Sequence, residues 1–356
     1  MIALDDTDQR GVDGAIDAAL ERLVRRGGAL GGGSTHLTQA AASAASGGKR
    51  LRPRLVVASY RSFSAPAHAA VSDEDAWQVA AAFELLHAAF VVHDDIIDGD
   101  VERRGVPNVA GRFQDRARRH DATPDDTAAV GRAAGLLAGD LLLFEATRLV
   151  ASIGADARVR TELIDVLDEA ILVSAAGELA DVENAAYRVV PDTDALLRAA
   201  HDKTSAYSFE APLVAGAILA GAPRGAQRAL ADAAADLGLA FQLVDDLIGT
   251  FGTRVQAGRA PGADLRQAKR TPLIGIARDT DAWPEVRTAL ALAHTGPVAV
   301  RRAQRVLEAS GARHDVVALV GDALQRARAN ASHPKLPAPT VSLLARIADA
   351  VESRVP

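Results

Sequence analysis

The sequence predicts an all-α protein, and this prediction rests on composition and on the spacing of apolar residues. Of the 356 residues, 49% are hydrophobic but only 4% are aromatic, and alanine, leucine and arginine are abundant. Runs of β-branched residues bounded by turn residues are scarce, which favours helices over strands. The sequence contains no internal repeat and no convincing linker, so we expect one domain over residues 1–356.

The first elements are predicted from a glycine break. A short amphipathic helix over 13–26 precedes the glycine-rich stretch Gly27 to Gly33, and Ser34 would cap a second helix. Residues 1–33 are therefore expected to form a peripheral N-terminal segment.

The next signal is a capping box at Ser72 and Asp75, which opens a long helix that ends near Asp98. Glycine and proline interrupt residues 103–124, which predicts a loop or a short broken helix. Further helices are expected at 125–153, 157–186, 193–202, 204–221 and 223–246, and in shorter pieces from Thr271 onward. The glycine-rich residues 249–270 are expected to form a mobile loop over a site.

Composition excludes several classes of function. The chain has no cysteine, which removes disulfides, thiolate nucleophiles and cysteine-ligated metal centres. Its net charge of -6 argues against general nucleic-acid binding. The acidic N-terminus does not resemble a secretory signal, and no apolar run reaches the roughly 18 to 20 residues of a spanning helix. We therefore expect a cytoplasmic protein with no transmembrane segment.

Two aspartate clusters carry the strongest functional signal. Asp94, Asp95 and Asp98 end one helix, and Asp245 and Asp246 lie near the end of another. Magnesium is usually held by one or two carboxylates together with phosphate oxygens and water. Unpaired carboxylates over an apolar helix face are costly, so bound cations would offset their charge. Two solvated helix ends are the alternative.

Residues one turn before the aspartates share their helix face. His87 and Phe90 lie on the stripe of Asp94 and Asp98, although an isolated histidine is more often a core or cap residue than a ligand. The second cluster repeats this layout in Phe241, Gln242, Asp245 and Gly249.

Basic residues stand near both clusters and suit phosphate groups, because guanidinium groups bind phosphoryl oxygens in pairs and lysine adds a point charge. As isolated runs they would be solvated turns. They are Lys49, Arg50 and Arg52, then Arg103 and Arg104, then Lys203 beside Thr204, and finally Lys269 and Arg270.

A family resemblance rests on motifs taken together: Gly47-Gly-Lys-Arg-Leu-Arg-Pro53, Glu84-Leu-Leu-His87, Asp94-Asp-Ile-Ile-Asp98, Arg103-Arg-Gly105 and Phe241-Gln-Leu-Val-Asp-Asp246. Their order and spacing resemble the trans-isoprenyl diphosphate synthase family. Gly139-Asp140, Lys203-Thr204 and Asp264 to Thr271 also look like family elements, so the resemblance covers about residues 45–280. The family implies an isoprenoid synthase helical bundle around a central elongation cavity, assembled as a homodimer.

The resemblance also implies an activity, the magnesium-dependent head-to-tail condensation of isopentenyl diphosphate with an allylic diphosphate. The allylic C–O bond ionises, the isopentenyl double bond attacks the carbocation, and loss of a proton completes elongation. Asp94, Asp95, Asp98 and Asp245, with Asp246 through water, would hold about three magnesium ions per site. Arg103, Lys203 and Lys269 would clamp the allylic diphosphate, Lys49, Arg52, His87 and Arg104 would bind isopentenyl diphosphate, and Thr204 and Gln242 would contact substrate.

Product length would depend on the residues below the first aspartates. Phe90 would form the floor of the cavity beside the small Ala89, which fits a short-chain product. We favour C20, geranylgeranyl diphosphate; a farnesyl or a longer prenyl diphosphate is the alternative.

Four positions depart from the commonest family pattern. Gly249 stands where a third aspartate is frequent, Glu178 where glutamine is frequent, Ala110 where histidine or asparagine is frequent, and Arg259 where lysine is frequent. A class I terpene cyclase is a rival activity, but it would not need the isopentenyl-binding set. A non-catalytic synthase subunit is a second rival, but it would be expected to lose aspartates or clamp residues.

Overall fold

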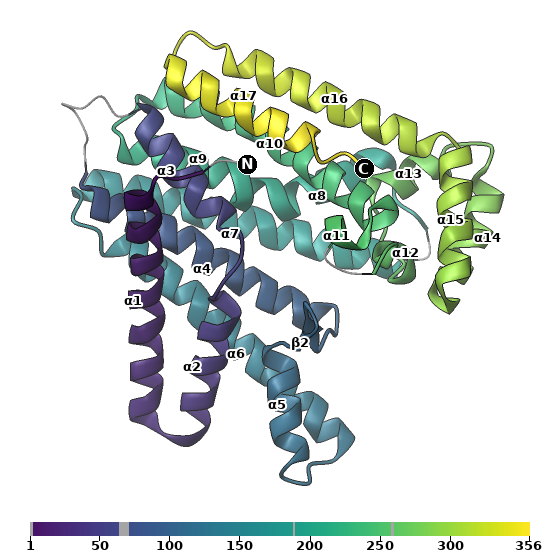
Figure 1. The fold of residues 1–356 in the computed structure, drawn as a ribbon, viewed down its shortest axis with the longest axis horizontal. Helices are drawn as coiled ribbons and strands as arrows, with labels where there is room; N and C mark the ends of the chain where they lie inside the picture. The colour runs from purple at the N-terminus through teal and green to yellow at the C-terminus, as the bar shows by residue number, and fades with distance from the viewer. Residues whose placement is uncertain (1–2, 64–70, 188, 258–259) are drawn as a thin grey trace. The chain divides into compact units, whose positions relative to one another are not determined.

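The computed structural model describes residues 3–63, 71–187, 189–257 and 260–356. These residues are overwhelmingly helical, which confirms the all-α fold class (Figure 1). The chain divides into two compact units. The N-terminal unit comprises Ile2–Asp165 and Ala215–Gly221, and the C-terminal unit comprises Val166–Val214 and Ala222–Pro356.

The N-terminal unit holds the first helices and one small hairpin. Its elements are α1 (Asp6–Leu30), α2 (Gly32–Ala45), α3 (Leu51–Phe63), α4 (Asp73–Ile97), β1 (Glu102–Arg103), β2 (Val106–Pro107), α5 (Val109–Arg118) and α6 (Pro124–Ala151). Helix α7 (Ala157–Ala186) begins in this unit and continues into the next.

The C-terminal unit holds the remaining elements. They are α8 (Thr193–Ala200), the π-helix η1 (His201–Glu210), α10 (Arg224–Phe251), α11 (Arg254–Ala257), α12 (Ala263–Arg266), α13 (Pro272–Arg278), α14 (Trp283–Leu292), the 3₁₀ turn η2 (Ala293–Thr295), α15 (Pro297–Ala309), α16 (Ala312–Ala331) and α17 (Ala338–Glu352). Helix α9 (Ala211–Leu219) is shared by the two units.

The boundary between the first two helices differs from the sequence prediction. Helix α1 starts at Asp6 and continues through most of the glycine-rich stretch, and Gly31, not Ser34, caps α2. A glycine inside a helix costs only about 1 kcal/mol, which tertiary contacts offset here. The buried carboxylate of Asp8 fastens α1, because it accepts hydrogen bonds from Arg61 of α3 and from Trp77 of α4 over 2.6 to 3.1 Å.

Helix α4 positions the first aspartates and is the core helix of its unit. Its predicted cap is confirmed, since the Ser72 hydroxyl accepts a hydrogen bond from the Asp75 N–H at 3.1 Å. Close packing of α6 depends on two glycines: a β-carbon at Gly135 would overlap Ile96, and one at Gly139 would overlap the ring of His93. Because α4 and α6 approach so closely, the end of α4 is held rigidly.

The stretch after α4, predicted as a loop or a short broken helix, contains an antiparallel hairpin that the sequence did not indicate. Arg103 pairs with Val106, and the two turn residues between them, Arg104 and Gly105, have positive φ of 56° and 78°. Two such residues in succession form the type I′ turn that suits a tight hairpin. The hairpin therefore fixes two arginines directly after the first aspartates.

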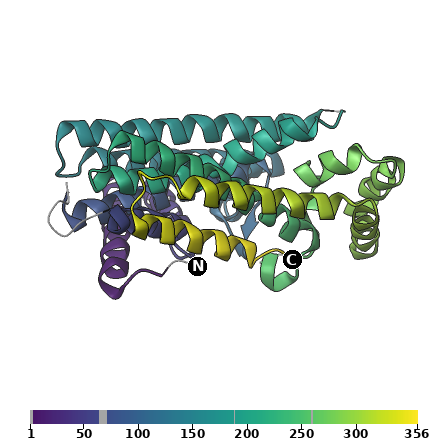
Figure 2. The same cartoon turned by 90° about the horizontal axis from the view of Figure 1, so that it is seen from above.

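Helix α10 is the centre of the C-terminal unit and packs against η1, α16 and α17. Figure 2 shows α16 and α17 lying side by side. The prediction that α10 ends at Asp246 was wrong, since it continues to Phe251. The following stretch, predicted as a loop, contains the short helices α11 and α12, while Gly258 and Arg259 lie outside the described residues. That this stretch is mobile remains a prediction.

Helix α6 corrects the expectation that no apolar segment is long enough to span a membrane. Within the described part of the chain, α6 is the one helix that is long enough and apolar enough to cross a membrane, judged by length and composition. However, 39% of its most apolar window is buried against the protein, so part of its apolar character serves internal packing.

Candidate active site

The first aspartate motif lies at the C-terminal end of α4, as predicted. Asp95 is buried, Asp94 is partly exposed, and Asp98, the C-cap residue, is exposed. The three carboxylates therefore differ in environment although they are close in sequence. Asp94 and Asp98 are the more accessible of the three to a ligand that arrives from solvent.

Arg103 of the hairpin binds the two adjacent carboxylates. Its Nε and Nη2 atoms donate to Oδ1 of Asp95 over 2.9 and 2.7 Å, and Nη2 lies 3.5 Å from Oδ2 of Asp94. Burial raises the pKa of Asp95 above its ordinary value, and the charge of Asp94 adds to this, while the bonds from Arg103 lower it. The arginine thus offsets a charge that the burial of Asp95 would otherwise disfavour.

His87 stands at the centre of a basic group in the same unit. Burial lowers its pKa well below the usual value, and the positive charges of Arg52, Arg103 and Arg104 lower it further. The imidazole is therefore neutral near pH 7. The structure brings together three of the four predicted ligands of isopentenyl diphosphate, Arg52, His87 and Arg104, with Arg103, which is predicted to bind the allylic diphosphate. Their combined charge suits an anion.

The two basic residues of the glycine-rich turn before α3, Lys49 and Arg50, have different environments. Gly47 and Gly48 have positive φ, and Arg50 donates to Oε1 of the buried Glu84 at 3.1 Å and to a backbone carbonyl. Arg50 therefore fixes the turn. Lys49 is left exposed.

Residues proposed to set product length lie one turn before the aspartates. Ala89 is completely buried, whereas Phe90 is only partly buried. Of the two residues, Phe90 is therefore the one with open surface beside it, which a residue that forms a cavity floor requires.

The second aspartate motif lies in the last turns of α10. The side-chain amide of Gln242 donates to Oδ1 of Asp246 at 2.8 Å. Burial, followed by the charge of Asp264, raises the pKa of Asp246 well above its usual range; Gln242 lowers it, and Asp245 and Asp181 raise it further. Four carboxylates thus lie near one another at this end of α10.

The glycine at position 249, where the resemblance leads one to expect a third aspartate, leaves space for Asp264. A β-carbon at Gly249 would overlap the carboxylate of Asp264, which is buried. A residue with a side chain at position 249 would therefore force Asp264 to move from its present position.

Lys203, in the first turn of η1, binds two acids of α7. Its Nζ atom lies 2.7 Å from Oδ2 of Asp181 and 3.0 Å from Oε2 of Glu178. A β-carbon at Gly177 would overlap the backbone of Lys203, so glycine allows α7 and η1 to approach. The unusual Glu178 therefore acts as a direct partner of Lys203. Thr204, next to it, is partly exposed, as is Lys269.

We expect the stability of the C-terminal unit to fall at alkaline pH because of His201 in η1. Its ring nitrogens lie 3.3 Å from Oε1 of Glu210 and 2.9 Å from Oδ1 of Asp202. The bond to Glu210, supported by Asp202 and opposed by burial, raises the pKa of His201 to about 9. This pKa exceeds the unfolded value of about 6.5, so the contribution is fully present below that pH. It is lost as pH rises through about 9.

Urea denaturation of the wild type and of His201→Gln from pH 6 to 10 measures this effect. The difference in unfolding free energy should shrink by about 2 kcal/mol as pH rises. Parallel curves for the two proteins would contradict the assignment.

The carboxylates fit a magnesium ion in their chemistry, although they do not form a complete shell. Among the described residues, no group of three or more acidic or histidine side chains converges as a metal-binding cluster. Magnesium commonly takes its remaining ligands from phosphate and water. Burial, and then the neighbouring carboxylate of Asp264, raise the pKa of Asp246, and a divalent cation there would stabilise its charged form.

A model of the family described as polyprenyl synthetase matches residues 34–308. The chain belongs to the polyprenyl synthetase family. The match includes the predicted core over 45–280 and extends past it at both ends. Arg259 lies within the match but outside the described residues.

Three similar proteins place the chain within this family. It is 31% identical to a short chain isoprenyl diphosphate synthase of Methanocaldococcus jannaschii, over 73% of this chain and 69% of that protein. It is 33% identical to the octaprenyl diphosphate synthase of Escherichia coli, over 64% of this chain and 62% of that protein, which is less than two thirds of its length. A crystal structure of the geranylgeranyl pyrophosphate synthase of Corynebacterium glutamicum, with isoprenyl diphosphate and magnesium, has a TM-score of 0.90 at 26% identity and covers 99% of both chains.

Sequence reasoning did not assign a role to three residues of this polyprenyl synthetase site. Asp181 could have been found, since it lies one turn after Glu178 on the same helix face. Asp264 lies in a stretch that was noted for its resemblance to a family element, but its proximity to Gly249 depends on the tertiary fold. Arg354 forms an ion pair with Asp245, from which it is 109 positions away in the sequence, and no local pattern indicates it.

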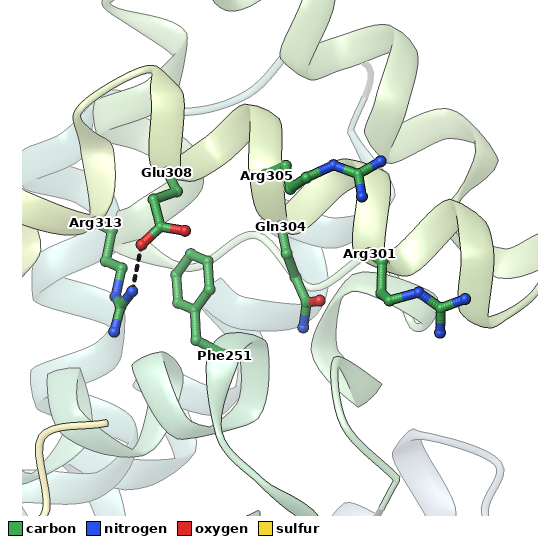
Figure 3. Close-up of a pocket in the computed structure, with 6 residues that line it drawn as sticks. All are labelled: Phe251, Arg301, Gln304, Arg305, Glu308 and Arg313. Carbon is green, nitrogen blue, oxygen red and sulfur yellow. Dashed lines mark hydrogen bonds and ion pairs between the residues drawn. The ribbon is translucent and has the colours of Figure 1, made fainter.

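A separate pocket of about 330 Å³ lies where the end of α10 meets α15 and α16. In Figure 3 the ring of Phe251 lies between Arg313 and Gln304, and Glu308 is ion-paired with Arg313. None of the family's predicted site residues lines this pocket.

Proposed function

We propose that the protein condenses isopentenyl diphosphate with allylic diphosphates, in a magnesium-dependent head-to-tail reaction, to give geranylgeranyl diphosphate. The observation that carries this proposal is the junction of Asp94 and Asp95 with Arg52, His87, Arg103 and Arg104 within one unit. A reaction between two diphosphates needs carboxylates that bind metal ions for one diphosphate, and beside them a set of basic residues that binds the other. A cyclase, with one diphosphate, would not need the second group.

The residues of each unit have defined tasks in this proposal. Bound magnesium would neutralise the charge that develops on the departing diphosphate. Asp94, Asp95 and Asp98 in the N-terminal unit and Asp245 and Asp246 in the C-terminal unit would hold the ions, about three per site by family resemblance. The chain's cations would bind phosphoryl oxygens: Arg103, Lys203 and Lys269 those of the allylic substrate, and Lys49, Arg52, His87 and Arg104 those of isopentenyl diphosphate, with Thr204 and Gln242 beside them.

Two cationic residues would exchange partners when substrate binds. Arg103 and Lys203 each hold two carboxylates in the free protein. When metal ions take over the charge of those carboxylates, the cations can turn to phosphate oxygens. The neutral His87 would gain a proton more easily beside a diphosphate, because a negative charge raises its pKa.

A C20 product is supported by Phe90 and by the likeness to the Corynebacterium protein. The relatives also include an octaprenyl diphosphate synthase, so family membership alone is compatible with several product lengths. The partly buried Phe90, below Asp94, is the feature of this chain that favours an early stop.

We also propose that the protein is a homodimer that associates through α6 and acts in the cytoplasm. The outer face of α6 exposes Val130, Leu137 and Phe144, spaced by seven residues, with exposed fractions of 41%, 51% and 62%. A row with this spacing forms an apolar stripe on one side of a helix. Covering it with a second copy would remove this surface from water.

The variant Phe144→Glu is expected to weaken the dimer by about 2 kcal/mol or more, because it places a charge at the most exposed residue of the stripe. Light scattering coupled to size-exclusion chromatography at several protein concentrations measures this. Leu30→Glu, at an apolar side chain that is 81% exposed on α1, is the control and should leave the mass unchanged. A monomeric wild type, or a Phe144→Glu dimer of normal stability, would contradict the proposed interface.

The enzyme class is tested by incubating purified protein with magnesium, an allylic diphosphate and labelled isopentenyl diphosphate. Incorporation of the label, abolished by a chelator, supports the synthase. Release of diphosphate from the allylic substrate without incorporation would favour the cyclase. Incorporation only after a second synthase is added would favour the non-catalytic subunit.

A further inference from the structure

The C-terminal end of the chain lies against the second aspartate motif. After α17 ends, Arg354 forms an ion pair with Asp245, and its guanidinium lies 4.5 Å from the centre of the Phe241 ring. One side chain thus contacts both the aspartate and the aromatic residue one turn before it. Arginine favours such a place because its planar group stacks on rings and binds carboxylates.

Other contacts hold this end of the chain in place, so the pair does not depend on one exposed side chain. Arg328 of α16 donates to Asp349 and Glu352 of α17 over 3.0 and 2.7 Å. Arg313, whose guanidinium lies 5.0 Å from the centre of the Phe251 ring, donates to the carbonyl of Pro356 at 2.7 Å. Arg354 is therefore anchored from both sides along the chain.

The guanidinium of Arg354 has donors beyond those used by Asp245. Its Nη2 atom donates to Oδ1 of Asp245, while Nη1 is buried and has no hydrogen-bond partner within the described residues. A buried donor without a partner costs about 1–3 kcal/mol, and more when it is charged. Nη1 itself is buried, but the side chain as a whole keeps 30% of its surface exposed, so the residue is not sealed off from a ligand at the motif.

The charge around Asp245 indicates what kind of ligand this donor suits. Asp245 and Asp246 are adjacent on α10, and the buried carboxylate of Asp264 lies against Gly249 one turn later, so carboxylates gather at this end of the helix and a divalent cation would relieve their repulsion. A guanidinium beside such a metal-carboxylate group is suited to a phosphoryl oxygen, which it binds through two parallel N–H bonds.

We propose that Arg354 is a positioning residue of the second aspartate motif, which orients the Asp245 carboxylate and donates to a phosphoryl oxygen of a diphosphate bound there. The inference rests on the proposed function, since it requires a diphosphate at this motif. It adds a residue that follows α17 to a proposed site whose other members come from α7, η1, α10 and α12. Both of its proposed partners, the Asp245 carboxylate and the phosphoryl oxygen, are negative, whereas magnesium is positive, so loss of Arg354 should affect the binding of pyrophosphate and of magnesium differently.

Titration calorimetry of the full chain with inorganic pyrophosphate and magnesium tests the inference. Arg354→Gln should weaken pyrophosphate binding about tenfold or more, because a charged donor is lost. Binding of magnesium alone should be unchanged or tighter, since a competing positive charge near Asp245 has been removed. Arg354→Lys, which keeps the charge without the planar fork, should lose less, about threefold.

The matched control is Arg326→Gln, which removes another arginine–aspartate pair from α10. Arg326 donates to Asp236 at 2.8 Å, and Asp236 lies about 13 Å before Asp245 along the helix axis. This control should bind pyrophosphate as the wild type does. If Arg354→Gln does not fold, the Arg354→Lys result decides alone. Unchanged pyrophosphate binding in the Arg354 variants, or an equal loss in the control, overturns the inference.

Kinetics with each substrate then identify which diphosphate is involved, because only the KM of that substrate should rise about tenfold in Arg354→Gln. Failure of the proposed function gives a different result. In that case the wild type itself neither binds pyrophosphate with magnesium nor incorporates isopentenyl diphosphate.

Discussion

Asp94→Ala is expected to lower kcat/KM on the order of 10²–10³-fold, because it removes a metal-binding carboxylate that the proposed mechanism needs to neutralise the leaving diphosphate. Folding should be preserved, since the Asp94 side chain is 28% exposed and its contact with Arg103 is long, at 3.5 Å. Steady-state kinetics measure the first effect and thermal unfolding the second. A melting temperature within a few degrees of the wild type would separate the loss of chemistry from the loss of structure.

Two companion variants make this result specific. Asp115→Ala removes an exposed carboxylate that pairs with Arg118 in the same unit and should leave turnover unchanged. Raising the magnesium concentration should restore part of the activity of Asp94→Asn, because a weakened site fills again at higher metal concentration. Wild-type turnover in Asp94→Ala would refute the metal assignment.

Phe90→Ala is expected to lengthen the product by one or more C5 units, because it removes the aromatic ring below Asp94 and deepens the space available to the growing chain. Phe90 is only partly buried, so the loss of stability should be smaller than the roughly 3–5 kcal/mol of a fully buried phenylalanine. Chromatography of the dephosphorylated products gives the chain lengths directly.

The control for this variant is Phe113→Ala, which removes another partly buried phenylalanine, on α5 of the same unit. It should change stability to a similar degree without altering product length. A product of unchanged length in Phe90→Ala would show that a residue on another helix forms the floor, while the enzyme class would stand.

Local patterns in the sequence were sufficient for the first motif. The capping box at Ser72, the stripe from His87 to Asp94 and the arginines that follow are all close in sequence, so spacing on one helix and one turn places them. The end of α4 was predicted correctly for the same reason. Even here the hairpin was missed, because the positive φ of Arg104 arises from the tight turn and arginine has no preference for it.

The second motif could be predicted only in part. Gly249 was identified as a departure, but the carboxylate that lies beside it comes from α12, beyond a stretch whose helices have little apolar periodicity. Glu178 was noted only as unusual, and its contact with Lys203 depends on how closely α7 and η1 pack at Gly177. Arg354 has no sequence signal at all. Contacts between distant segments are set by packing, and spacing along one helix carries no information about them.

The central claim is that this polyprenyl synthetase elongates allylic diphosphates to C20. It is tested most directly by incubating the protein with magnesium and labelled isopentenyl diphosphate, separately with the C5, C10 and C15 allylic diphosphates, and sizing the dephosphorylated products. We predict elongation that ends at C20 and disappears when magnesium is chelated. Elongation that ends at another length would contradict the assignment of Phe90, and no incorporation with any of the three substrates would contradict the proposed activity.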